Sequence, residues 1–322
     1  MPLFILVRLF TVLPVLFGVS VFVFLLVHLA PGDVTSTLTG PMATPEARDA
    51  IRVKLGLDKP LVVQYAIWFG HLLEGDFGTS WVHRRSVIEM VLPKFLNTAI
   101  LALSAALFAY IIGFLAGIFA AARRYSVTDR VVMGGTLVAG STPLYWLGLV
   151  LVFLFALKWR LLPATGMVSV VDGGGFVDVL RHLILPAVTS SLPSGAIVAR
   201  TTRATMLEVL GQNYIRVARA KGVPVRTILR KHALRNALPP IVTVAGMELG
   251  YLLGGVVFVE VVFAWPGIGN QLYASIIGRD IPTVQGAVLL IAMAFVLINL
   301  AADVLNVYIE PRTRAAVTGH RP

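Results

Sequence analysis

The stretch Arg203–Pro240 reads RATMLEVLGQNYIRVARAKGVPVRTILRKHALRNALPP and separates two apolar segments of the chain. It contains eight Arg or Lys residues and one acidic residue, Glu208. Ionised side chains are costly to place in hydrocarbon, so this stretch cannot lie within a lipid bilayer. Because cytoplasmic loops of membrane proteins collect Lys and Arg, it is expected to be an inner loop between two membrane-spanning helices.

The residue order within this loop predicts a helix, a tight turn and a second helix. Apolar residues recur at helical spacing from Leu207 to Val217, Gly222 supplies a helix stop, and Pro224 prevents simple continuation. A second helix restarts at Val225–Asn236. An exposed turn between two short helices is suited to docking into a cleft of another protein, although a basic loop can also serve only as an orientation signal.

The composition of the chain is that of an integral membrane protein. Of 322 residues, 57% are hydrophobic and 13% are charged, and the mean hydropathy is +0.85, which no ordinary soluble domain of this length would tolerate. The net charge of +11 would also suit a nucleic-acid-binding protein, but the basic excess is confined to a few loops. The absence of cysteine excludes disulfides and thiolate chemistry.

The hydropathy pattern predicts an all-α membrane protein with six transmembrane helices, because six apolar segments are long enough to cross a bilayer. A cleavable signal peptide is the competing interpretation of the first, but that apolar run is too long and ends in a poor cleavage site. The expected spans are Phe10–Ala30, Asn97–Ala121, Val131–Leu157, His182–Ala199, Ala237–Phe263 and Thr283–Asn306.

Charge asymmetry between the loops predicts that both termini are cytoplasmic. With that orientation the inner side carries 16 basic and three acidic residues, whereas the outer side carries 11 and 10. The outer segment 31–95 has seven basic and seven acidic residues. Within it, Leu61–Leu73 is apolar on one helical face, follows a proline suited to a first turn, and is too short to span. It is expected to be an amphipathic helix at the outer membrane surface.

Two short motifs carry a family resemblance. The sequence ARAKG at 218–222, followed by HALRN at 232–236, resembles the coupling loop of permease subunits in ATP-binding-cassette (ABC) importers of the dipeptide, oligopeptide and nickel type. Where the generic importer consensus has Glu-Ala-Ala, this chain has RVA at 216–218, which matches the peptide branch better. The resemblance extends over nearly the whole chain, including LPATG at 162–166 and RDIPTVQG at 279–286.

The resemblance implies a type I ABC importer permease fold and a domain organisation. The chain resembles the first permease of the importer pair. It is therefore expected to have an N-terminal transmembrane helix at 1–30 and a periplasmic segment at 31–95. A permease domain at 96–310 would contain the coupling loop 203–236, and a cytoplasmic tail would follow at 311–322. Expected docking residues for an ATPase subunit are Ala218, Arg219, Ala220, Lys221, Gly222, Val223, Pro224, His232 and Arg235.

The resemblance also implies the partners and the cargo. A second homologous permease, two ATPase subunits and an external substrate-binding protein are expected, and the cargo is expected to be a di- or oligopeptide. The chain has no Gly-x-x-x-x-Gly-Lys-Ser/Thr motif, so ATP and Mg²⁺ would bind the ATPase subunits and this chain would need no cofactor. Nickel or another small solute remains an alternative cargo. A secondary transporter or channel is a less favoured class.

Polar residues in the fourth and fifth spans are candidates for the translocation pathway. Ser190 and Ser194 lie near two prolines, and such residues are tolerated where neighbouring helices or a wet cavity satisfy freed backbone groups. Acidic residues in a span are functional candidates because hydrocarbon is costly for them. Glu248 is placed to face the substrate route and attract the amino end of a peptide, whereas Glu260 is more suited to a structural or gating role.

Small residues mark possible helix contacts. Gly246, Gly250 and Gly254 are four apart on one face of the fifth span, which permits close approach of another backbone. That partner is either a helix of the same chain or the second permease subunit. Gly113 and Gly117 make a single, weaker repeat of the same kind. The six histidines are scattered, and no metal-binding or catalytic cluster emerges.

Overall fold

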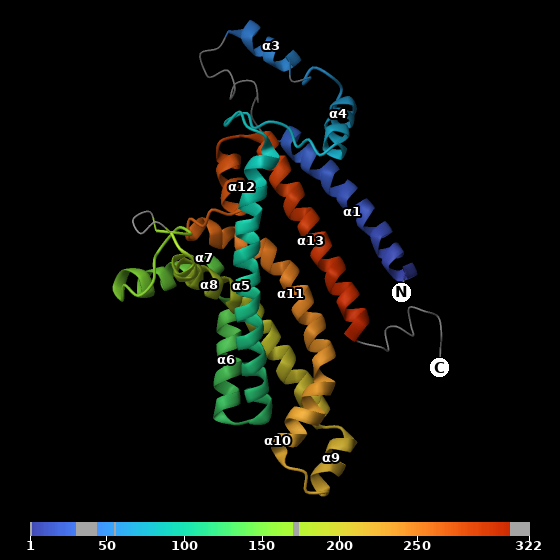
Figure 1. Cartoon of the computed structure of the whole chain (residues 1–322), viewed down its shortest axis with the longest axis vertical. Helices are drawn as coiled ribbons and strands as arrows, with labels where there is room; N and C mark the ends of the chain where they lie inside the picture. The colour runs from blue at the N-terminus through green and yellow to red at the C-terminus, as the bar shows by residue number, and fades with distance from the viewer. Residues whose placement is uncertain (1, 30–43, 55, 170–173, 310–322) are drawn as a thin grey trace. The chain divides into compact units, whose positions relative to one another are not determined.

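The computed structural model describes residues 2–29, 44–54, 56–169 and 174–309. Within these ranges the secondary structure is almost entirely helical, and the only extended pairing described is an isolated antiparallel bridge between Thr79 and Ser86 (Figure 1). The predicted all-α fold class is therefore confirmed. The expected tail at 311–322 and the start of the expected periplasmic segment, 31–43, lie outside the described residues.

The helices follow one another without a sheet, and their labels are those of Figure 1. They are α1 (Pro2–Leu29), α3 (Pro45–Lys54), α4 (Leu61–Leu73), α5 (Val87–Ala122), α6 (Val127–Ser141), α7 (Leu144–Leu151), the π-helix η1 (Val152–Lys158), α8 (Phe176–Leu210), α9 (Asn213–Ala220), α10 (Val225–Thr227), the π-helix η2 (Ile228–Ala233), α11 (Leu234–Val262), α12 (Ile268–Ile277) and α13 (Ile281–Ile309).

Four segments of the described chain are long and apolar enough to cross a membrane as unbroken helices. They are Val87–Ala122, Phe176–Leu210, Val225–Val262 and Ile281–Val304, and each contains one predicted span or most of it. The first predicted span lies on α1, a 28-residue helix that includes the apolar stretch Phe10–Leu25. The architecture thus agrees with a multi-pass membrane protein of about the predicted number of spans.

The third predicted span, Val131–Leu157, is not one continuous helix in the structure. α6 ends at Ser141, α7 begins at Leu144, and the two helical segments are bent by 108°. Thr142 adopts an extended conformation (φ −82°, ψ 128°) immediately before Pro143. Proline disfavours the helical conformation of the preceding residue and has no N–H to continue a helix, which explains the break. The segment is a broken span or a re-entrant loop.

The chain divides into two compact units, one centred on Thr98–Trp265 and the other on Val7–Asn97 with Pro266–Val296. In the first unit α8 is the central helix and contacts α6, α7 and α11. Within its most apolar window 72% of residues are buried, against 22–33% for the other three unbroken spans. The prediction that the proline- and serine-rich fourth span lies in the interior is confirmed.

Helices α5 and α8 cross closely in this unit, at the weaker of the two glycine repeats. A β-carbon on Gly113 would lie 2.5 Å from the carbonyl oxygen of Gly195, and one on Gly117 would lie 2.6 Å from that of Ala199. Such distances are shorter than van der Waals contact, so only glycine permits this approach. Gly113 and Gly117 therefore set the α5–α8 distance.

In the second unit the amphipathic helix α4 packs against α1. Tyr65 lies 5.3 Å from Phe24 and 6.3 Å from Phe17 between ring centroids, and its hydroxyl is 2.8 Å from the Ser20 hydroxyl. Trp68 adds a contact of 5.7 Å with Phe24. The predicted apolar face of Leu61–Leu73 is thus the packed face. Edge-to-face geometry favours the two Tyr65 pairs, whereas the Trp68–Phe24 pair is tilted.

A buried carboxylate anchors the segment that precedes α5 to the start of α13 in the same unit. Asp280 is 1% exposed and accepts hydrogen bonds from the Ser80 hydroxyl (2.5 Å), the Trp81 backbone N–H (3.0 Å) and the Thr283 hydroxyl (2.7 Å). Buried donors that lose their acceptor retain the full cost of desolvation. Asp280 therefore holds together segments 200 residues apart in the sequence.

Replacing Asp280 by alanine is expected to loosen this anchor strongly, because three donors lose one buried acceptor group. The expected loss of unfolding free energy is about 3 kcal/mol, given ~1–3 kcal/mol for each unsatisfied group with incomplete additivity. Limited proteolysis of residues 75–86 and thermal unfolding of the purified protein would measure it. The control is Asp76→Ala, since Asp76 is exposed and accepts only a local bond from the Gly78 N–H. Equal protease resistance of the two variants would contradict the anchor.

Candidate functional site

The basic loop forms the predicted helix, turn and helix. α9 ends at Ala220, and the turn that follows is closed by hydrogen bonds from the Gly222 N–H to the Arg219 carbonyl (3.0 Å) and from the Val223 N–H to the Ala218 carbonyl (3.2 Å). Gly222 has φ +73°, the left-handed conformation that glycine adopts without strain. Pro224 then caps α10. The predicted helix stop and restart are confirmed.

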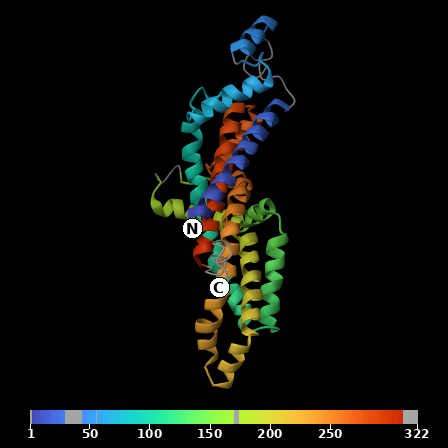
Figure 2. The ribbon, with the colours of Figure 1, turned by 90° about the vertical axis from the view of Figure 1, so that its right-hand side faces the viewer.

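Helices α8 and α11 form a hairpin, and the turn lies at the end where the chain passes from one helix to the other. Figures 1 and 2 show α9 and α10 extending past the ends of α5 and α6, which belong to the same unit. Of the nine expected docking residues, most are exposed and three are partly buried. The exposed residues are Arg219, Ala220, Lys221, Gly222, Pro224 and Arg235, and the partly buried residues are Ala218, Val223 and His232.

A small apolar core joins the turn to the membrane-spanning helices. Ile215 of α9 is fully buried, and Ile228 of η2 is 1% exposed. Helix η2 contacts α9, α8 and α11. Met206 of α8, Ala233 of η2 and Ala237 of α11 belong to one buried cluster. Because close-packed interiors transmit displacement with little compression, a force on α9 would be passed to α8 and α11.

An ion pair that the sequence did not reveal ties α6 to the part of α8 that enters the loop. The Arg203 guanidinium donates to both carboxylate oxygens of Asp129, at 2.6 and 2.7 Å. Asp129 also accepts the Tyr125 backbone N–H at 2.9 Å, and the Ser126 hydroxyl caps α6. The bond from Arg203 is the main cause that lowers the pKa of Asp129 below its usual value. The only sequence signal was an isolated acid among basic residues.

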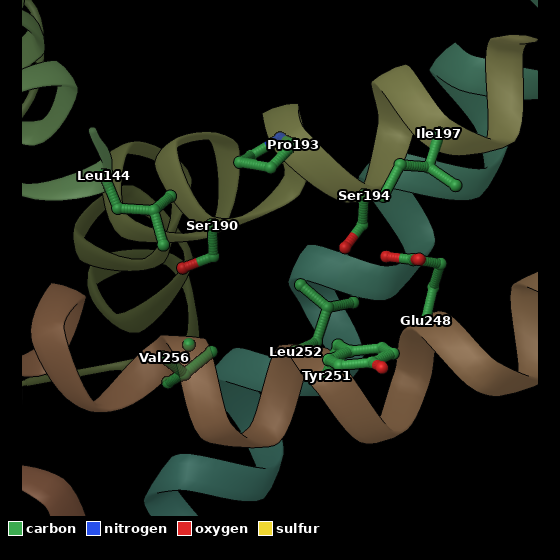
Figure 3. Close-up of a pocket in the computed structure, with 10 residues that line it drawn as sticks. Leu144, Ser190, Pro193, Ser194, Ile197, Glu248, Tyr251, Leu252 and Val256 are labelled. Atoms are coloured by element: carbon green, nitrogen blue, oxygen red, sulfur yellow. The ribbon is translucent and has the colours of Figure 1, made fainter. Parts of the chain in front are cut away.

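A cavity of about 460 Å³ lies between α7, α8 and α11 (Figure 3). Three of the four pathway candidates line it: Ser190, Ser194 and Glu248. Glu248 is 6% exposed, and the Ser194 hydroxyl points toward its carboxylate (Figure 3). The remaining lining is apolar except for the Tyr251 hydroxyl. The lining residues are Leu144, Ser190, Pro193, Ser194, Ile197, Glu248, Tyr251, Leu252, Gly255 and Val256.

Glu260, the fourth pathway candidate, does not line this cavity. Its side chain is fully buried, and the Thr98 hydroxyl of α5 donates a hydrogen bond to its Oε1 atom. The backbone carbonyl of Glu260 also accepts the Trp265 N–H, at 2.9 Å. The geometry agrees with the structural alternative considered for Glu260, because its carboxylate joins α5 to α11.

The glycine row of α11 is divided between two environments. A β-carbon on Gly246 would lie 3.0 Å from the β-carbon of Ala302 in α13, so this position makes a contact within the chain. Gly250 is buried, whereas Gly254 is exposed and a β-carbon there would meet nothing within 4 Å. The exposed end of the row adjoins two large apolar side chains, Tyr251 and Phe258.

Comparison with known proteins identifies the class to which this site belongs. Residues 113–315 match the family described as binding-protein-dependent transport system inner membrane component, and residues 1–104 match the N-terminal region of such a component. The chain belongs to this family of transporter membrane components. It is a multi-pass inner-membrane protein and the permease subunit of an ABC importer, in which the ATPase is a separate subunit.

Two curated relatives match almost from end to end. The chain is 38% identical to the dipeptide transport system permease protein DppB of Escherichia coli strain K12, over 97% of this chain and 98% of the relative. It is 41% identical to the glutathione transport system permease protein GsiC of Salmonella typhimurium strain LT2, with the same coverage. An inward-facing MetNI methionine ABC transporter structure matches 69% of this chain and 97% of its own, with a TM-score of 0.57 at 19% identity, which shows a shared fold.

Proposed function

We propose that this permease imports di- or oligopeptides and forms half of their translocation pathway. The proposal is supported by its near full-length similarity to permeases named for dipeptide and glutathione transport. A second homologous permease would supply the other half, and a substrate-binding protein would deliver the cargo. Two ATPase subunits would bind ATP and Mg²⁺.

The observation that carries the coupling proposal is the exposed turn at Ala218–Pro224, closed by Gly222 at φ +73°. This turn docks into a cleft of the ATPase subunit, and both chain termini lie on the same cytoplasmic side. When ATP closes the ATPase dimer, the clefts move and carry the turns with them. The buried contacts of Ile215 and Ile228 pass that displacement to α8 and α11, which reorient the pathway.

The exposed part of the α11 glycine row is the proposed contact with the second permease. Gly254 leaves space beside Tyr251 and Phe258, and small residues next to large ones allow close helix packing in membranes. Gly246 is already occupied by Ala302 of the same chain. The proposed subunit contact therefore uses the Gly254 end of the row.

Reconstitution of the complete importer in liposomes tests this function. With ATP and the binding protein present, uptake of radiolabelled di- and tripeptides is expected, and omission of the ATPase subunits is expected to abolish it. Competition with unlabelled glutathione and with a nickel chelate distinguishes cargo classes. Flux through the permease alone, without ATPase subunits, would contradict the proposal and indicate a channel or secondary transporter. ATP-driven uptake of nickel but not of peptides would contradict the peptide assignment.

A further inference from the structure

The cavity between α7, α8 and α11 has the electrostatic character of a cation site. Glu248 brings the only carboxylate to its lining, and none of the described lining residues is Lys, Arg or His. A carboxylate in a mostly apolar lining is costly to ionise without a counter-ion, so a cation that enters the cavity gains the attraction that water no longer supplies.

A second, independent feature is a buried hydroxyl without a partner. Ser190 is 3% exposed, and its Oγ atom has no hydrogen-bond partner in the structure. The side chain belongs to the wall of the cavity, on the same helix as Ser194 (Figure 3). Buried hydroxyls in proteins are almost always hydrogen-bonded, so an unpartnered one in the wall of a cavity is a candidate to bind a ligand there.

The two features are arranged along one helix. Ser194, beside the Glu248 carboxylate, lies one turn after Ser190 on α8, a rise of about 6 Å. An ammonium group at Glu248 and Ser194 would therefore place the atoms that follow it along the chain near Ser190. The volume of about 460 Å³ is within the ~300–1,000 Å³ of small-molecule sites.

We propose that this cavity is a subsite for the protonated amino terminus of a peptide. Glu248 is the counter-ion, the Ser194 hydroxyl accepts a second ammonium N–H, and the Ser190 hydroxyl bonds the first peptide unit. Tyr251, Leu252 and Val256 form apolar walls that leave the first side chain largely unspecified. The cationic site itself stands on the geometry, whereas its assignment to a peptide rests on the proposed function.

The cysteine-free sequence allows a direct test of the local charge. In the full importer complex without nucleotide, Ser190→Cys would be reacted with a cationic and an anionic methanethiosulfonate, the ethylammonium and ethylsulfonate derivatives. The ratio of their rates, normalised to a free thiol, cancels changes in thiol reactivity. It is expected to favour the cation by ~tenfold, because opposite charges attract strongly in a poorly solvated site. Adding Glu248→Gln is expected to remove this preference.

Ser191→Cys is the matched control, because the Ser191 hydroxyl already donates to the Val188 carbonyl and does not line this cavity. Its rate ratio should not respond to Glu248→Gln. If Ser190→Cys fails to assemble, Ile197→Cys places a thiol elsewhere in the same lining. The partner subunits would be used without accessible cysteines. Alternatively, the modification measured in a complex with the unsubstituted permease would be subtracted as background.

Protection by ligands tests the peptide assignment. A dipeptide with a free amino group, added without the binding protein, is expected to slow the modification at least several-fold, whereas its N-acetylated form is expected to have no effect. Equal protection by both peptides, or a rate ratio unchanged by Glu248→Gln, would overturn the subsite. If the charge preference appears and simple amines protect, but the reconstituted importer takes up no peptide, the cation site stands and the proposed function fails.

Discussion

Replacing Gly222 by valine is expected to abolish ATP-driven uptake while the permease still inserts in the membrane. A β-carbon at this position would meet nothing within 4 Å, so the substitution causes no steric clash in the permease itself. Its effect comes from φ +73°, which a β-branched residue adopts only with strain. The strain is ~1–3 kcal/mol, enough to favour a different turn and displace the residues that flank it.

The readouts are ATP-dependent uptake and co-purification of the ATPase subunits with the permease. Both should fall more than tenfold for Gly222→Val. They should fall much less for Gly222→Asn, because asparagine tolerates the left-handed conformation better than other side chains. The matched control is Gly75→Val, since Gly75 also has positive φ and an open surrounding but lies outside the proposed docking turn. Loss of ATPase co-purification in Gly75→Val, or normal uptake by Gly222→Val, would contradict docking at this turn.

The conformation of this turn was predictable because its determinants are local. Gly222 and Pro224 act on their own backbone angles, and the apolar spacing of α9 fixes which side is buried. The break in the third span also has a local signal, Pro143, but hydropathy averages over that residue and predicted one helix. Helix-breaking residues therefore predict where these helices end better than the length of an apolar run does.

Residue contacts between helices were harder to predict. The repeat at Gly113 and Gly117 is short, yet both of its glycines lie at a close helix crossing, whereas the longer row on α11 is only partly packed. A glycine pattern shows that close approach is permitted and does not identify the neighbouring helix. Hydrophobic spacing likewise could not pair Asp129 with Arg203, which are 74 residues apart.

The separation of Glu248 from Glu260 follows from helix geometry. Twelve residues at 3.6 per turn amount to three full turns plus about 120°, so the two carboxylates emerge on different faces of α11. The sequence showed that both were in the same span. The positions of α8 and α5 decide that Glu248 faces a cavity and that Glu260 faces Thr98.

Removing Arg203 is expected to destabilise the permease more than removing its partner Asp129. Arg203→Ala leaves a carboxylate that is 3% exposed without its cation, and breaking a buried pair in this way costs about 3–5 kcal/mol. Asp129→Ala leaves a guanidinium that is 23% exposed and can reach water, so its cost is expected to be smaller. The double variant should recover part of the loss in Arg203→Ala, because the orphaned charge is then absent.

Thermal unfolding of the purified complex measures these changes. The control is Arg200→Ala, because Arg200 is an exposed arginine one turn earlier on α8.

The pKa of Asp129 is lowered in the folded protein by the bond from Arg203, so its contribution to stability is fully present above the ordinary aspartate value of about 3.9. It is lost as the pH falls through the lowered folded value. The difference between wild type and Arg203→Ala should therefore stay constant from about pH 8 to pH 6 and shrink only in strong acid. A double variant as unstable as the sum of the two single variants would show that the residues act independently, and α6 would then not be tied to α8 through this pair.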